Sequence, residues 1–414
     1  MLRVPMLFAF AIACFTGSVR GQPLNENQTE FLARSLVTIC PGGSLSETDW
    51  HALTPLLKDK RIVLIGEFNH GSKEVFLLRN SLIRYLHENL GFNTVLFESG
   101  IGELALPNLQ MDNLSPKQMT FGFFGGWRTL EFRELMGFIR AEKMTVAGFD
   151  VQRTGGSFRQ LLIETAAETG MDSTLYNNLE DRYGKIARRL TARSAVYDSV
   201  RQETEALMSG YRKVQAGLAH PGKTSTTEAQ ALVERTLLNR IAYLDYMLQF
   251  VRDRNWSKRW TARDSAMAEN VVWLNDRFWK QDKLIIIGHN YHISKFSARE
   301  RVMGQLLREH FGDEMYSIGT FAGRGAYADN AGKTIQMPPP DPTGLDIKHL
   351  IGQMAGFAGF LDMPDKAEPG SDWLNGKITV NDTFIDLSGS HEMVLSRHFD
   401  GLLLLKTVSP PEKN

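Results

Sequence analysis

The chain has 414 residues, of which 43% are hydrophobic and 23% are charged, and these proportions exclude a disordered, collagen-like or coiled-coil protein. It carries 47 basic and 47 acidic residues, so it lacks the excess of Lys and Arg with which nucleic-acid binders contact phosphates. The composition therefore predicts a globular protein whose partner is a small molecule and not a nucleic acid.

The first 21 residues have the pattern of a secretory signal peptide. Arg3 precedes an apolar run over residues 4–15, and small residues follow that run. The run is shorter than the roughly 20 residues that cross a membrane, so it predicts a leader removed on export and no integral membrane span in the mature chain. We therefore expect a periplasmic or extracellular protein. An alternative is lipid anchoring at Cys14, which follows the small residue Ala13.

Six short apolar runs predict the strands of a central sheet. Strands that are apolar throughout are buried on both faces, which is typical of parallel sheets covered by helices. Helical patterns separate the runs, so the sequence predicts an α/β fold with a largely parallel central sheet flanked by helices. The runs are 61–65, 94–97, 145–149, 284–287, 315–318 and 402–405.

Helical periodicity accounts for the segments between the predicted strands. Apolar residues recur at helical spacing in 74–89, 130–142 and 156–169. Residues 173–280 contain no strand-like run, only long charged amphipathic segments. We therefore expect 173–280 to be an all-helical insert, acting as a lid or wall, within one α/β domain that spans 22–414.

Ionisable residues directly follow four of the predicted strands. The carboxyl ends of parallel strands meet at one edge of the sheet, where open α/β sheets bind their ligands. Ionisable groups next to a buried strand are costly unless they pair or act on a ligand, so we expect one shared functional site at this edge. The residues are Glu67, His70, Glu98, Asp150, His289 and His292.

These residue types favour a hydrolase that activates water with a general base. Histidines and carboxylates converge, whereas the Gly-x-Ser-x-Gly motif of serine esterases does not occur in the sequence. A competing interpretation is a metal-dependent hydrolase or peptidase, because His70, His289, His292 and Glu67 could bind zinc or another divalent ion. A third interpretation is an exported binding protein without catalytic activity.

Two other patterns are interpreted as structural. Residues 217–224 match the spacing of a P-loop, but they follow a charged amphipathic helix instead of a buried strand, so we expect a turn between helices. Four tryptophans lie at helical spacing and are expected to pack against the rest of the protein. They are Trp256, Trp260, Trp273 and Trp279.

Several motifs, in order along the chain, resemble the erythromycin esterase family. The resemblance extends from about Arg61 to Leu405. It implies a carboxylic ester hydrolase without a metal or cofactor, of the kind that opens the macrolactone ester of macrolide antibiotics and so gives antibiotic resistance. The motifs are Ile65-Gly-Glu67-Phe-Asn-His70-Gly71 followed by Glu74, Arg79 and Glu98, then Trp127-x-x-x-Glu131, Arg263-Asp264-x-x-Met267-Ala-Glu269-Asn270, Gly288-His289-Asn290-x-His292 and Phe399-Asp400-Gly401.

The resemblance also implies roles for individual residues. It makes His70 the general base for water, with Glu67 and Glu98 as the carboxylates that hold and polarise it. His289 is a further candidate catalytic residue. The candidate substrate-binding residues are Glu74, Arg79, Asp150, Asn290 and His292.

Two details are left open or depart from the family pattern. Arg263 and Glu269 share a predicted helix and pair either near the site or with each other. In the first motif, Phe68 and Asn69 replace a small residue and a Thr or Ser. We expect this replacement to change the shape of the pocket without altering the catalytic residues.

Overall fold

The computed structural model describes residues 24–39, 50–168, 173–218, 227–342, 344–364, 366–381 and 389–413. The predicted signal peptide, Cys14 and most of the P-loop-like segment lie outside these ranges. Among the helices within them, none combines the length and the apolar character that a membrane crossing requires.

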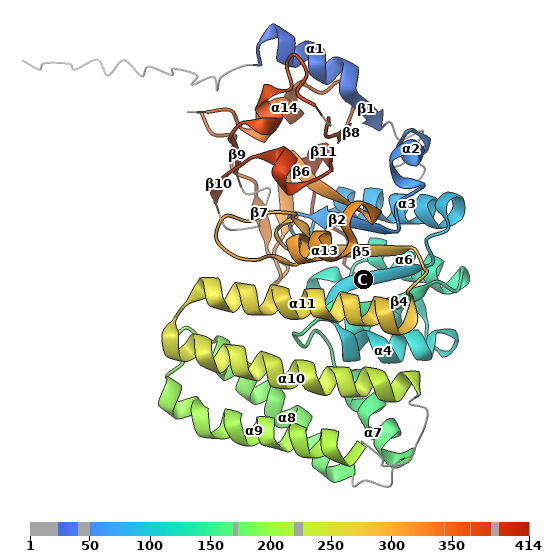
Figure 1. Ribbon diagram of the computed structural model, residues 1–414, viewed down its shortest axis with the longest axis vertical. Helices are drawn as coiled ribbons and strands as arrows, with labels where there is room; N and C mark the ends of the chain where they lie inside the picture. Colours follow the sequence, from blue (N-terminus) through green and yellow to red (C-terminus); the bar gives the residue numbers. More distant parts are fainter. Residues whose placement is uncertain are drawn as a thin grey trace, which may run out of the picture.

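A nine-stranded sheet forms the centre of the protein (Figure 1), with strand order β1-β8-β11-β6-β2-β5-β3-β4 and β7 paired to β6. The strands from β11 to β4 in this order are parallel, whereas β8 is antiparallel to both of its neighbours and β7 is antiparallel to β6. The prediction of a largely parallel sheet with six apolar strands is confirmed. The strands are β1 (Leu36–Ile39), β2 (Ile62–Glu67), β3 (Thr94–Gly100), β4 (Thr145–Asp150), β5 (Leu284–His289), β6 (Met315–Ala328), β7 (Thr334–Gln336), β8 (Ala358–Asp362) and β11 (Gly401–Val408).

The central strands are buried along their whole length, because helices cover both faces of the sheet. Alternate residues of β2 show this directly. Ile62 and Leu64 belong to one hydrophobic core, whereas Val63 and Ile65 belong to the other. Successive side chains of a strand point to opposite faces, so the apolar run seen in the sequence supplies both cores.

Helices α3 (Lys73–Leu90), α6 (Leu130–Ala141) and α7 (Phe158–Glu168) occupy the three segments where helical periodicity predicts them. Helix α3 ends at Gly91, whose φ of +76° is a left-handed conformation that glycine adopts without steric cost. The other helices outside 173–280 are α1 (Glu26–Ser35), α2 (Thr54–Leu57), α4 (Ile101–Leu109), α5 (Pro116–Met119), α12 (Asn290–Ile293), α13 (Met303–Phe311), α14 (Ile347–Gln353), α15 (Asp372–Asn375) and α16 (Leu395–His398).

Four long helices follow α7 and form a layer of their own below the sheet in Figure 1. Helix α11 packs against β4, and α10 packs against α4. Buried Arg240 of α10 reinforces this packing, because it donates hydrogen bonds to Glu103 of α4 and Glu180 of α8. The described residues of 173–279 include no strand, while a function of this layer as a lid stays a prediction. The helices are α8 (Ser173–Thr191), α9 (Tyr197–Leu218), α10 (Glu228–Asp253) and α11 (Trp256–Phe278).

A small second sheet near the carboxyl terminus was not predicted from the sequence. Strands β9 (Ile378–Asn381) and β10 (Ser390–Met393) pair antiparallel, and α16 follows β10 almost directly.

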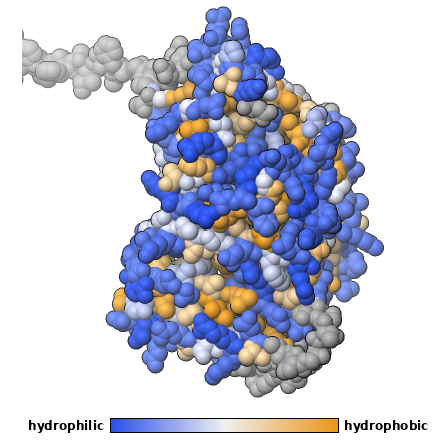
Figure 2. All heavy atoms as spheres, in the orientation of Figure 1, coloured by the Kyte–Doolittle hydropathy of each residue, from blue (hydrophilic) through white to orange (hydrophobic). Residues whose placement is uncertain are grey.

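Hydrophilic residues dominate the face drawn in Figure 2, with hydrophobic residues in scattered groups.

Candidate active site

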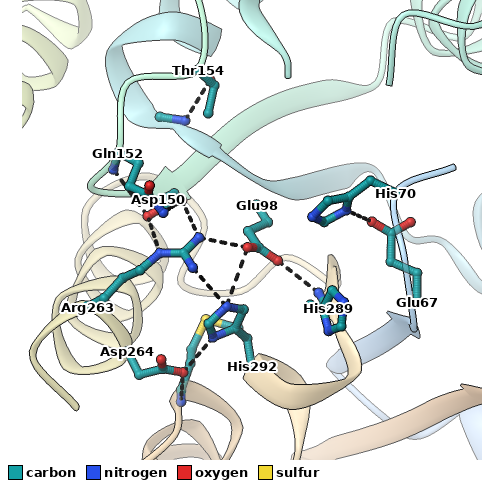
Figure 3. A network of polar contacts seen from close by, with 12 residues as sticks. Glu67, His70, Glu98, Asp150, Gln152, Thr154, Arg263, Asp264, His289 and His292 are labelled. Atoms are coloured by element: carbon teal, nitrogen blue, oxygen red, sulfur yellow. Dashed lines mark hydrogen bonds and ion pairs between the residues drawn. The ribbon is translucent and has the colours of Figure 1, made fainter. Parts of the chain in front are cut away.

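The carboxyl ends of four neighbouring strands bring the predicted site residues together (Figure 3). The strands β2, β5, β3 and β4 follow one another in the sheet. Glu67 ends β2, His289 ends β5 and Asp150 ends β4, while Glu98 lies near the end of β3. The structure therefore places these side chains at one edge of the sheet, where the strand pattern predicts a shared site.

Glu98 lies at an irregularity in the pairing of β3 with β4. The two strands pair in register up to Phe97, and the register shifts before Gly100. Gly148 of β4 allows the close approach, because a Cβ atom there would lie 2.3 Å from the carbonyl oxygen of Ser99. Such bulges redirect side chains near functional sites, and this one directs Glu98 toward the site.

His70 is linked through the buried carboxylate of Glu67 to the buried guanidinium of Arg79. Its Nδ1 atom lies 2.7 Å from Oε1 of Glu67, and Nη1 of Arg79 donates a hydrogen bond of 2.6 Å to Oε2 of the same carboxylate. Burial lowers the pKa of Arg79, and the adjacent Glu67 carboxylate counteracts this. When Nδ1–H donates a hydrogen bond to Glu67, Nε2 is the nitrogen that can accept a proton.

Aromatic rings and a tight turn fix the position of His70. Phe124 stacks on its ring at 6.0 Å between centroids, and Trp127 contacts it edge-on at 5.7 Å. In the turn, Oδ1 of Asn69 accepts a hydrogen bond of 2.9 Å from the backbone N–H of Gly71. These contacts hold the imidazole plane in one orientation.

Phe68 and Asn69 are not among the residues that line the cavity described below. Both side chains are buried, and Phe68 packs edge-on against Tyr327 at 6.1 Å between ring centroids. Asn69 holds the turn that carries His70, so an effect of the replacement on the pocket would be indirect and stays a prediction.

Glu98 joins Arg263 to the backbone of His289. Its Oε1 atom accepts a hydrogen bond of 2.7 Å from Nη2 of Arg263, and its Oε2 atom accepts one of 2.9 Å from the backbone N–H of His289. Burial alone would raise the pKa of Glu98, but the nearby positive charges, above all on His292 and Arg263, outweigh it and hold that pKa well below its usual range. Glu98 is therefore a carboxylate at neutral pH.

Asp150 is a second buried carboxylate on the same guanidinium. Nη2 of Arg263 donates a hydrogen bond of 2.7 Å to Oδ2 of Asp150, and Nε donates one of 3.3 Å to Oδ1. Burial opposes the charge of Arg263, but Asp150 and Glu98 outweigh it and raise the pKa of Arg263 well above its usual value. Asp150 is only 1% exposed, so its predicted contact with substrate is corrected to that of a counter-ion.

Both ring nitrogens of His292 contact protein groups. Nδ1 lies 2.9 Å from Oδ1 of Asp264, and Nε2 lies 3.0 Å from Nη1 of Arg263. Burial would lower the pKa of His292, but Asp264 and Glu98 outweigh burial and raise it. A guanidinium can only donate, so Nε2 accepts from Arg263 when the ring of His292 is neutral. When the ring is protonated, Nε2 carries a hydrogen and faces Oε1 of Glu98 at 3.5 Å. These contacts orient His292, whose ring lines the cavity, and its contact with substrate stays a prediction.

A cavity of about 830 Å³ opens onto the cluster. This volume lies within the usual range for small-molecule sites. Helix α11 and the segment after β5 form one wall, and β10, α16 and Lys377, which directly precedes β9, form the unpredicted wall. The lining residues from the cluster are His70, Glu98, Arg263, His289 and His292, and those from the walls include Trp260, Tyr291, Phe296, Lys377, His391, Met393, Arg397 and His398.

Besides Asp150, three predicted substrate-binding residues have structural partners and are absent from the lining of this cavity in the described part of the chain. Both carboxylate oxygens of Glu74 accept hydrogen bonds of 2.6 Å from Ser409. Asn290 is buried and exchanges two hydrogen bonds, of 2.7 and 3.0 Å, with the backbone of Thr320. Arg79 is buried beneath Glu67, so its predicted contact with substrate is also corrected.

Of the four tryptophans that were expected to pack, three lie in α11 and Trp279 directly follows its end. Trp273 and Trp279 pack against the hydrophobic core as predicted. Trp256 packs edge-on against Phe250, with 4.6 Å between ring centroids, although it is 56% exposed. Trp260 lines the cavity, with its ring 6.2 Å from that of Tyr291. Of the four tryptophans, Trp260 is the one that contributes an aromatic surface to the cavity.

The sequence model of the erythromycin esterase family matches residues 87–408. The chain belongs to the erythromycin esterase family. A relative from Bacillus subtilis (strain 168), YbfO, carries a provisional hydrolase name and is 25% identical over 99% of this chain and 97% of its own length. Erythromycin esterase type II of Escherichia coli is 27% identical over 66% of this chain and 71% of its own length. A solved structure from Bacillus cereus has the same fold, with a TM-score of 0.75 and 21% identity over 95% of this chain and 100% of that one. The family and the names of these relatives place the chain among the hydrolases.

In this member of the erythromycin esterase family, sequence reasoning missed the importance of Arg263 and Asp264. Arg263 binds at the site, whereas Glu269 is exposed and lies 3.9 Å from Arg235. Asp264 holds His292 and also accepts a hydrogen bond from the backbone of Met303. A signal existed in the sequence, because Arg263 and Asp264 share a helix face with apolar residues such as Met267, Val271 and Leu274.

Within the described ranges, no three side chains of His, Cys, Asp or Glu are arranged so that they could hold a metal ion. Two of the ligands in the metal interpretation have other partners. His292 contacts the cation of Arg263, and Glu67 lies between His70 and Arg79.

Proposed function

We propose that the chain is an exported carboxylic ester hydrolase in which His70 activates water. The observation that carries this proposal is the 2.7 Å contact between His70 Nδ1 and the buried carboxylate of Glu67, on an imidazole that lines the cavity. Export is inferred from the leader pattern of the first 21 residues.

The paired carboxylate suits His70 to general base catalysis. Glu67 accepts a hydrogen bond from Nδ1–H, which leaves the lone pair on Nε2 to take a proton from water as the water attacks the ester carbonyl. The imidazolium that forms is stabilised by the same carboxylate, which Arg79 holds in place. The tetrahedral adduct then expels the alcohol, and the proton on His70 returns to the leaving oxygen.

His289 is the proposed second catalytic group. Its ring lies edge-on to that of His70 with 5.5 Å between centroids, and both rings line the cavity. A carbonyl carbon placed near His70 would bring the developing oxyanion within reach of an N–H of His289. A preorganised donor of this kind lowers the barrier by stabilising charge that appears only in the transition state.

The proposed substrate is a bulky ester, including a macrolactone. The cavity volume of about 830 Å³ and the aromatic rings of Trp260, Tyr291 and Phe296 support a large ligand with an apolar surface. The similarity to erythromycin esterase type II of Escherichia coli supports a macrolactone in particular.

The test is product analysis with a panel of esters that contains erythromycin, a p-nitrophenyl ester and an aliphatic lactone. The reactions are run in ¹⁸O-labelled water, with the wild type, His70→Ala and a control, His87→Ala. His87 is half-buried on α3 and contacts the backbone of Phe92. We expect the wild type and the control to release an acid carrying one solvent oxygen. Absence of hydrolysis across the panel, or equal hydrolysis by His70→Ala, would refute the proposal.

A further inference from the structure

We propose that Arg263 is a positioning residue that keeps Glu98 in one ionised orientation and, through Glu98, fixes the backbone of His289. Arg263 comes from α11, whereas Glu98 and His289 come from two neighbouring strands of the sheet. The inference deepens the proposed function, and its kinetic test rests on that function.

All three guanidinium nitrogens of Arg263 contact protein groups (Figure 3). Nε faces Asp150, Nη1 faces His292, and Nη2 contacts both Glu98 and Asp150. The residue is 8% exposed although it lines the cavity. Four of its five N–H donors are directed at protein groups, so Arg263 acts on the reaction chiefly through its neighbours.

The two oxygens of Glu98 explain how this influence reaches His289. Oε1 accepts from Arg263 and Oε2 accepts from the backbone N–H of His289, at 2.7 and 2.9 Å. A carboxylate held at both oxygens has one orientation, so the point where β5 passes into α12 is fixed relative to α11. Since His289 begins this transition, the same bond sets the direction of its side chain.

Asp150 also holds the guanidinium of Arg263 in place. It contacts Nε and Nη2 of Arg263 and is itself held by the backbone N–H of Gln152 at 3.1 Å. The bidentate geometry prevents the guanidinium from turning away from Glu98. A lysine has one charged nitrogen and cannot contact both carboxylates in the same way.

The ionisation of Glu98 depends on the groups that face it from each packed element. These are Arg263 of α11, His289 and His292 at the end of β5 and in α12, and His70 after β2. Glu98 is 3% exposed, so loss of the guanidinium leaves a buried carboxyl whose charge water does not stabilise.

The first test measures the protonation of Glu98 and does not require activity. Protein labelled with ¹³C in the glutamate carboxyl groups is titrated by NMR, and the Glu98 signal is assigned by its absence in Glu98→Gln. In Arg263→Met we expect the pKa of Glu98 to rise by about 1–3 units, the usual effect of an adjacent opposite charge. Arg263→Lys retains the charge and should give a smaller rise, and it also serves if the methionine variant does not fold.

The second test is a double-mutant cycle on kcat for p-nitrophenyl butyrate. If Arg263 acts through Glu98, Arg263→Met should reduce kcat about 100-fold in the wild type, since displacement of a catalytic group by about 1 Å has effects of that size. The same substitution should cost about threefold or less when Glu98 is already Gln, because coupled residues are not additive.

The matched control is Arg240→Met, which removes another buried arginine that bridges two carboxylates but does not line the cavity. It should lower stability and leave both kcat and the Glu98 titration unchanged. An unchanged Glu98 pKa in both Arg263 variants, or equal losses of kcat in the two backgrounds, would overturn the inference. If no ester is hydrolysed by the wild type, the proposed function fails, and the titration still decides the role of Arg263.

Discussion

Replacement of Arg79 by methionine should destabilise the protein strongly, and removal of the charge on Glu67 should restore much of the loss. Arg79 is 1% exposed and Glu67 is fully buried. Nη1 of Arg79 donates a hydrogen bond of 2.6 Å to Glu67. Among the described residues, Nε and Nη2 of Arg79 have no hydrogen-bond partner. The substitution therefore leaves a buried carboxylate without its cation.

The expected magnitude follows from this burial. Breaking a buried ion pair by removing one partner costs about 3–5 kcal/mol in free energy of unfolding. Arg79 also stacks on Phe76, with 4.7 Å from its Cζ atom to the ring centroid, but methionine can fill most of this space. The double variant Glu67→Gln/Arg79→Met no longer carries the unpaired buried charge. It should therefore recover about 1–3 kcal/mol of the free energy of unfolding that Arg79→Met loses, which is the cost of an unsatisfied buried group.

The assay is urea unfolding of the wild type, the two single variants and the double variant at pH 7, followed by tryptophan fluorescence. We expect the double variant to be more stable than Arg79→Met alone. A double variant whose loss equals the sum of the two single losses would refute the reasoning, because independent sites add and coupled partners do not.

Three further predictions concern acid stability, a close backbone approach and substrate affinity. The pKa of Glu98 is lowered by folding from a usual value of 4.5, so the stability it contributes is present above that pH and is lost as the pH falls toward the folded-state pKa. The stability advantage of the wild type over Glu98→Gln, measured by urea unfolding, should therefore shrink as the pH falls below 4.5. Gly66→Ala should cost about 1–3 kcal/mol in a urea titration, because its Cβ would lie 2.2 Å from Oδ1 of Asn290, whereas Gly156→Ala, with open space around its Cβ, should cost at most a few tenths. Trp260→Ala should raise KM for a bulky ester about tenfold and leave KM for a small acetate ester nearly unchanged, and equal effects on both esters would exclude the aromatic wall as the cause.

Strands with a continuous apolar run were predictable, and strands at the margins of the sheet were not. The run that forms β2 is buried on both faces, so hydrophobicity alone identifies it. In β1 and β7 most side chains are partly or fully exposed, and each strand is only 3 or 4 residues long. Such strands depend on a partner distant in sequence, as β1 does on β8, and this pairing leaves little local signal.

The site was predictable to the extent that polar residues follow buried strands. Glu67, His70 and Glu98 could be placed at one edge of the sheet because parallel strands end together. Arg263 could not be placed in the same way, because its position depends on how α11 packs against the sheet. The reach of a side chain is equally hard to predict from sequence, since Arg79 is close in sequence to His70 yet lies buried beneath Glu67.

The cavity wall formed by β10 and α16 shows a third limit. His391 and Met393 line the cavity, although roughly a hundred residues separate them from His289 in the chain. No motif links the two segments, and only the tertiary fold brings them together.

The most direct test of the central claim compares kcat of His70→Ala with that of His87→Ala on the best ester in the panel. A positioned general base contributes about 10²–10⁴-fold, so kcat of His70→Ala should fall by that factor while His87→Ala stays within about twofold of the wild type. Thermal unfolding of both variants establishes that they are folded. A folded His70→Ala variant that keeps the wild-type kcat would contradict the account.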